Sequence, residues 1–135
     1  MAQAIRDGTA TAVRDGSNKD GIGITAYTIV NHTSEYEHPI VGALLVPGSV
    51  KEGDSHHCEL SGIYGIVITV QCILDQYAIN TGSIHVACDN KQALHVFDPE
   101  FLPDTHQANF VLINTLTYLI RTSSITWTCE HVCGY

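Results

Sequence analysis

Apolar residues recur through the middle of the chain in a pattern that predicts one long helix. Between residues 57 and 78 the sequence has no proline, and apolar side chains return every three or four positions, as on one helix face. These positions are Leu60, Ile63, Val67, Val70 and Leu74. The β-branched run 66–70 alone favours a strand, but about 22 residues is too long for one. We therefore predict a helix that ends at Gly82 and that, through Gly62 and Gly65, lies close against a sheet.

Five shorter segments have the composition and alternation of β-strands. Their ranges are 9–13, 22–30, 40–46, 83–88 and 124–129. The first is expected to stop at the turn signal Asp15-Gly16-Ser17. In the second, every other residue from Ile22 to Val30 belongs to one face, and in the last Ile125, Trp127 and Cys129 are predicted to face inward.

The remaining segments predict two further helices and a loose end. Residues 91–97 fit a short helix, and Asp104 can cap a second long one. The apolar stripe of that second helix is predicted at Ala108, Val111, Leu112, Thr115, Leu116 and Leu119. Residues 1–8 are expected to form a loose N-terminal arm, followed by a single domain over 9–135.

The order of these elements predicts an α/β fold. Three consecutive strands form an antiparallel meander, and strands that follow helices are added in parallel because such crossovers join parallel neighbours. We expect a five-stranded mixed sheet, three strands antiparallel and two parallel, with helices on both faces.

The composition limits which cellular compartment and which binding partners we expect for this chain. With 135 residues, 44% of them hydrophobic, the chain is large enough for one globular core. It has neither a signal-peptide pattern nor an apolar run of membrane-spanning length, so we expect an intracellular protein of the cytoplasm or nucleus with no membrane partner. Fourteen acidic against six basic residues argue against a free-standing nucleic-acid binder. A nucleic-acid substrate would need bound cations or an attached domain.

Three acids stand at the ends of predicted elements. Asp15 closes the first strand, Glu59 opens the central helix, and Asp89 closes the fourth strand. If they converge they repel one another unless cations bridge them, and carboxylates suit Mg²⁺ or Mn²⁺. The alternative is that the two Asp residues cap turns and Glu59 is solvated. A zinc site is a further alternative, built from Cys129, His131, Cys133, His56, His57 and Cys58, but the usual spacing of two residues between cysteines is absent.

Three motifs together resemble the ribonuclease H domains of retroelement reverse transcriptases. They are D-G-S at 15–17, E-L-S-G-I-Y-G at 59–65 and H-V-A-C-D-N-K-Q-A-L at 85–94. The order Asp, Glu, Asp is that of this family, and the resemblance covers about residues 9–135. The ending W-T-C-E-H-V-C-G-Y is similar to the final strand of the family, with His131 matching a first histidine.

The resemblance implies a ribonuclease H-like fold and a two-metal endonuclease that hydrolyses the RNA strand of RNA/DNA hybrids. Asp15, Glu59 and Asp89 would bind two Mg²⁺ or Mn²⁺ ions, and Ser17, Asn18 and Asn90 would contact the substrate. An adjoining polymerase domain is the expected partner. Tyr135 stands where the family has a second histidine, and its fourth acid would follow later. We therefore expect a truncated or decayed copy with weak activity, or an inactive scaffold.

Overall fold

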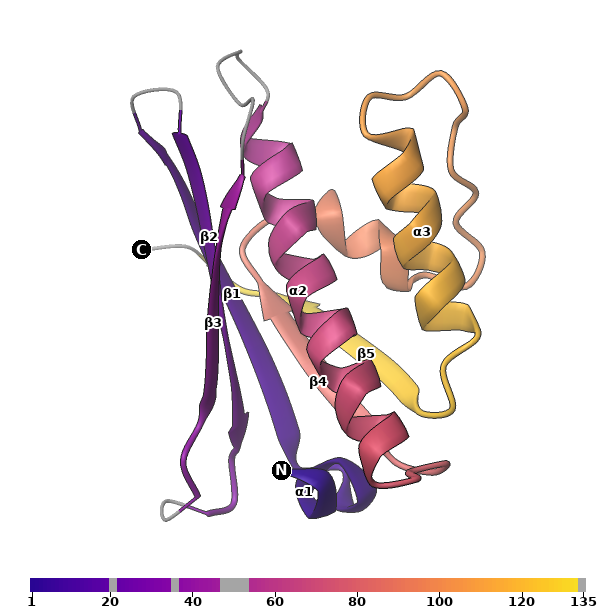
Figure 1. Cartoon of the computed structure of the whole chain (residues 1–135). Helices are drawn as coiled ribbons and strands as arrows, with labels where there is room; N and C mark the ends of the chain where they lie inside the picture. Colours follow the sequence, from indigo (N-terminus) through magenta and orange to yellow (C-terminus); the bar gives the residue numbers. More distant parts are fainter. Residues whose placement is uncertain (20–21, 35–36, 47–53, 134–135) are drawn as a thin grey trace.

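A sheet of five strands forms one layer of the structure, a computed structural model of the chain (Figure 1). The structure describes residues 1–19, 22–34, 37–46 and 54–133, and the side chains of 15–19, 22, 46, 54 and 55 lie outside this description. The strands are β1 (Ala10–Lys19), β2 (Ile22–Asn31), β3 (Ile40–Val46), β4 (Ser83–Cys88) and β5 (Thr126–His131). The helices are α1 (Ala2–Asp7), α2 (Asp54–Gln76), the 3₁₀-helix η1 (Ala93–Phe97) and α3 (Phe110–Arg121).

The strand order β3-β2-β1-β4-β5 confirms the predicted mixed sheet. β2 pairs with both β1 and β3 in antiparallel fashion, whereas β1 pairs with β4 and β4 with β5 in parallel. Because β1 and β4 are parallel, they run toward the same edge of the sheet. Asp89 follows β4 at that edge.

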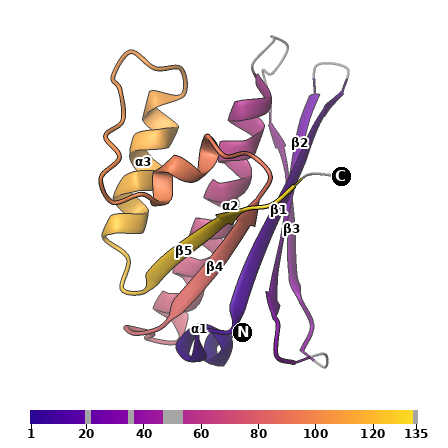
Figure 2. The same ribbon diagram turned by 180° about the vertical axis from the view of Figure 1, so that it is seen from behind.

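The long helices lie on one face of this sheet, which differs from the expected cover on both faces. In Figures 1 and 2, seen from opposite sides, α2 and α3 lie together on the same side of the strands. The other face has no helix among the described residues, and side chains such as Val41 and Leu45 are 68% and 71% exposed there. The period-two pattern could not reveal this, because apolar residues occupy both sides of β3.

Two glycines bring α2 against the sheet, as predicted. A Cβ at Gly62 would meet the side chains of Arg14 and Thr25, and one at Gly65 would lie 2.6 Å from the Tyr27 ring. The helix buries its predicted stripe of Leu60, Ile63, Val67, Val70 and Leu74. Residues 56–76 are long and apolar enough to cross a membrane, contrary to the expectation, yet more than half of the stretch is buried inside this fold. Packing on the sheet accounts for that apolar length.

Several element boundaries differ from the prediction. β1 continues through the predicted turn at 15–17 to Lys19, because β2 pairs with it over the whole length, so Asp15 does not close this strand. The expected loose arm contains α1, whose Ile5 is fully buried. α2 ends at Gln76, before Gly82, and Ala78 follows with a left-handed φ of 51°.

α3 begins later than predicted, and, apart from Leu116, the residues that it buries in the core are not the ones of the predicted apolar stripe. Its N-cap is Asn109, whereas Asp104 accepts a hydrogen bond from the backbone of His106 in the preceding loop. The buried residues of α3 are Ile113, Leu116, Thr117 and Ile120. Val111, which was predicted to be inward, is 77% exposed. Similarly, in β5 Trp127 stacks on Phe97 with ring centroids 6.0 Å apart, but Cys129 is exposed.

Candidate functional site

Two of the predicted acids converge at one edge of the sheet. Glu59 lies near the start of α2, and Asp89 follows directly after β4. One ligand atom from each of Glu59, Cys88 and Asp89 lies within 4.8 Å of the others. The convergence follows from the topology, because the end of β4 and the beginning of α2 reach the same edge. This is the only cluster of three possible metal ligands among the described residues.

A third side chain, Arg14 of β1, stands between the two carboxylates. Its Nη2 is ion-paired with Oε2 of Glu59 and donates a hydrogen bond to Oδ1 of Asp89 at 3.0 Å. The Arg14 side chain is fully buried, while those of Glu59 and Asp89 are 13% and 37% exposed. The three charges therefore form a bridged triad with the guanidinium at its buried centre.

The alternation of β1 places Arg14 in this position. Ala10 and Ala12 are buried, so Arg14, two residues further on, continues the same face of the strand. The missing side chain of Gly62 makes room for the arginine stem beneath α2. Sequence analysis did not assign Arg14 to the site, although the alternation Ala10-x-Ala12-x-Arg14 would have placed it on the helix-covered face.

Further hydrogen bonds fix the segment around Asp89. The Cys88 thiol lies 3.9 Å from Oε2 of Glu59, and the backbone N–H of Asn90 donates to Cys88 Sγ at 3.4 Å. Nε2 of His131, in neighbouring β5, donates to the Asp89 carbonyl at 3.1 Å. The Asp89 backbone is thus held from β5, while its side chain faces Arg14.

The other predicted site residues are placed in different ways. Asp15, Ser17 and Asn18 belong to β1 by their backbone, and their side chains lie outside the described part of the chain. Their roles stay predictions. The side-chain oxygen of Asn90 accepts a hydrogen bond from the backbone N–H of Ala93, the first residue of η1, at 3.0 Å. Tyr135 also lies outside the description.

The described residues of the triad do not fit a divalent cation. Carboxylate oxygens suit Mg²⁺, but here both carboxylates already bind a guanidinium, and the adjacent thiol is a soft ligand that Mg²⁺ does not favour. The zinc alternative is not formed either. Cys129, Cys133 and the histidines of α2 make no three-ligand cluster in the described chain.

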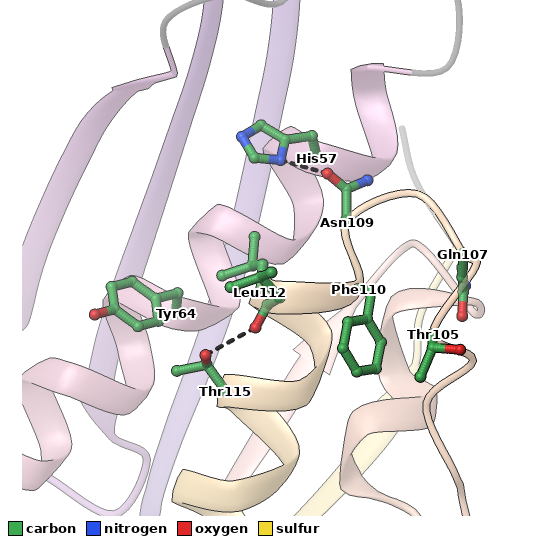
Figure 3. Close-up of a pocket in the computed structure, with 9 residues that line it drawn as sticks. His57, Tyr64, Thr105, Gln107, Asn109, Phe110, Leu112 and Thr115 are labelled. Atoms are coloured by element: carbon green, nitrogen blue, oxygen red, sulfur yellow. Dashed lines mark hydrogen bonds between the residues drawn. The ribbon is translucent and has the colours of Figure 1, made fainter.

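An open groove lies between α2, α3 and the loop that precedes α3 (Figure 3). It has a volume of about 650 Å³, and its lining includes His57 and Tyr64 of α2 and Phe110 and Thr115 of α3. Nδ1 of His57 lies 2.7 Å from the Asn109 side-chain oxygen, which joins the two helices there. The pKa of the adjacent His56 is lowered, chiefly because this side chain is partly buried and also because His57 and His95 lie nearby.

Solved structures share this architecture, which is the ribonuclease H fold. LC11-RNase H1, isolated from compost by a metagenomic approach and solved in complex with an RNA/DNA hybrid, superposes with a TM-score of 0.68 at 7% identity, covering 92% of this chain and 85% of that one. The N-terminal RNase H domain of a Mycobacterium tuberculosis protein gives 0.60 at 10% identity, covering 93% and 87%.

A viral structure adds a reverse transcriptase to these neighbours. The foamy viral protease-reverse transcriptase, solved in complex with double-stranded DNA, gives a TM-score of 0.57 at 15% identity, covering 96% of this chain and 86% of that one. No protein-family model and no curated protein matches the sequence. The likeness therefore defines the fold of this chain.

Proposed function

We propose that this chain is a ribonuclease H-type module that acts on RNA/DNA hybrids within a retroelement reverse transcriptase. The observation that carries the proposal is the convergence of Glu59 and Asp89, from α2 and β4, at one edge of a ribonuclease H fold. A neighbour with this fold was solved on such a hybrid, and another is a viral reverse transcriptase. The reaction would be hydrolysis of the RNA strand, and an adjoining polymerase domain would be the partner.

In this proposal Asp15, Glu59 and Asp89 remain the predicted ligands of Mg²⁺ or Mn²⁺, and the last two could bind a cation only after Arg14 has released them. Ser17, Asn18 and Asn90 would lie along the substrate. Arg14 holds two of the acids in the described state. The chain's own contribution to turnover is therefore limited by how often these carboxylates are released.

A second candidate function is a non-catalytic ribonuclease H-like scaffold. The bridged triad favours it, because the two converging acids are neutralised by a side chain of the same protein. The formal net charge of −8 also favours it, since Lys and Arg contacts to phosphates supply most nucleic-acid affinity. The two candidates differ in turnover, not in fold.

Cleavage of a labelled RNA/DNA hybrid in Mn²⁺ at low salt tests the first candidate. We expect slow loss of the RNA strand that Asp89→Asn abolishes. Asp75→Asn is the matched control, because Asp75 lies on the exposed far end of α2 and pairs only with Gln71 among the described side chains. Cleavage that survives Asp89→Asn contradicts the proposal and indicates a contaminating nuclease. No cleavage, with the hybrid still bound, favours the scaffold.

A further inference from the structure

Arg14 takes the place that a metal ion would need between Glu59 and Asp89. The three side chains come from β1, α2 and the end of β4, and one nitrogen of the guanidinium contacts both carboxylates. We propose that Arg14 is a resident cation that keeps divalent ions out of this site. The inference deepens the proposed function, because it concerns regulation of the same acids, but metal binding can be measured without any cleavage.

The burial of Arg14 makes its displacement costly. A divalent ion that took both carboxylates would leave a guanidinium without a partner, and an unpaired buried charge is strongly destabilising. Nε and Nη1 of Arg14 have no hydrogen-bond partner among the described atoms, so Nη2 carries the polar contacts that hold the side chain. Losing those contacts would remove every described partner of the charge.

The arginine stem also has little room to swing away. Gly62 and Thr25 lie against it, and even a single methyl group at Gly62 would overlap its Cγ. The Arg14 side chain therefore lies between α2 and the sheet formed by β1 and β2, on which this helix packs. Entry of a cation requires this helix to move relative to the sheet or the positive charge to be removed by substitution.

A guanidinium is not deprotonated in proteins, whereas a histidine titrates near neutral pH. The exclusion of cations is expected to hold in neutral and mildly alkaline buffer alike, unlike a site that opens when a histidine titrates.

The charge and the shape of Arg14 can be separated by two substitutions. Arg14→Gln removes the charge but keeps a polar side chain, so the two carboxylates lose their counter-ion. Arg14→Lys keeps a charge as a compact ammonium on a flexible stem. We expect Mn²⁺ to bind the Gln variant well and the Lys variant poorly, because neutralisation of the acids is the cause of exclusion.

Isothermal titration of Mn²⁺ into the folded chain, with thermal unfolding alongside, tests the proposal. The expected result is binding at least about tenfold tighter in Arg14→Gln than in wild type, a difference of about 1.4 kcal/mol. Mn²⁺ should also raise the melting temperature of that variant. Arg6→Gln is the matched control, since Arg6 is exposed and donates to the Tyr77 carbonyl just past the end of α2, whereas Glu59 lies near the start of that helix. It should bind Mn²⁺ as wild type does.

Equal affinity in wild type and Arg14→Gln would overturn the inference, as would an Arg14→Lys variant that binds like Arg14→Gln. If Arg14→Gln fails to fold by circular dichroism, wild type is compared with Asp89→Asn. The same weak Mn²⁺ affinity in both supports exclusion, whereas affinity lost with Asp89 shows that wild type already binds the ion there. Hybrid cleavage is measured separately. If Arg14→Gln gains Mn²⁺ binding but does not cleave the hybrid, this inference stands and the proposed nuclease is refuted. If wild type binds Mn²⁺ and cleaves the hybrid, the proposed nuclease stands and this inference is refuted.

Discussion

Glu59→Gln separates two opposite views of the acid cluster. If the acids are a vacant cation site, removing one negative charge relieves repulsion and stabilises the fold. If Arg14 bridges them, the same change removes a partner from a buried charge. The second view follows from the contacts, because Arg14 is fully buried and Glu59 is 13% exposed.

The size of the effect can be estimated from the triad. Removing one partner of a buried ion pair costs about 3–5 kcal/mol when the other charge is left alone. Here Asp89 still contacts Arg14 at 3.0 Å, so we expect a smaller loss, roughly 1–3 kcal/mol in the free energy of unfolding. For a domain of this size that lowers the melting temperature by roughly 4–10 °C.

Thermal and urea unfolding followed by circular dichroism, in buffer containing a chelator, measure this difference. Glu130→Gln is the control, because Glu130 is 56% exposed and pairs with His85 on the open face of the sheet. We expect that control to change stability by less than about 0.5 kcal/mol. An unchanged or raised melting temperature in Glu59→Gln would refute the bridged triad.

Three further predictions concern packing and titration. Gly65→Ala should lower the free energy of unfolding by about 1–3 kcal/mol, because its Cβ meets the Tyr27 ring, and chemical denaturation checks this. Leu116→Ala should cost about 2–5 kcal/mol and Val111→Ala under about 0.5; equal costs would contradict the described face of α3. His56 has a lowered pKa, so its contribution to stability is present above about pH 6.5 and is lost as the pH falls toward its folded value. His56→Gln should therefore flatten the fall in stability between about pH 7.5 and about pH 5.5, and an unchanged slope would contradict it.

Much of the fold could be predicted from local patterns. β3 and β4 have the predicted bounds, and the apolar stripe of α2 is the predicted one. The glycine signal of α2 also gave its close approach to the sheet. These features depend on residues near one another in the chain, where periodicity and steric size are sufficient.

The face of α3 and the length of β1 could not be predicted in the same way. Both are decided by partners distant in sequence: β2 extends β1 through an apparent turn signal, and the loop held by Asp104 delays the start of α3. The site shows the same limit. Residue order identified Glu59 and Asp89, but the burial that brings Arg14 between them depends on how β1 lies under α2.

The central claim is that an arginine occupies the position of a cation at this site. A crystal structure of the wild-type chain grown or soaked in Mn²⁺, with anomalous data recorded at a wavelength where manganese scatters, tests it most directly. The account predicts no anomalous peak between Glu59 and Asp89 and a guanidinium in contact with both. A peak at about 2.0–2.3 Å from oxygens of both carboxylates, with Arg14 turned away, would contradict it.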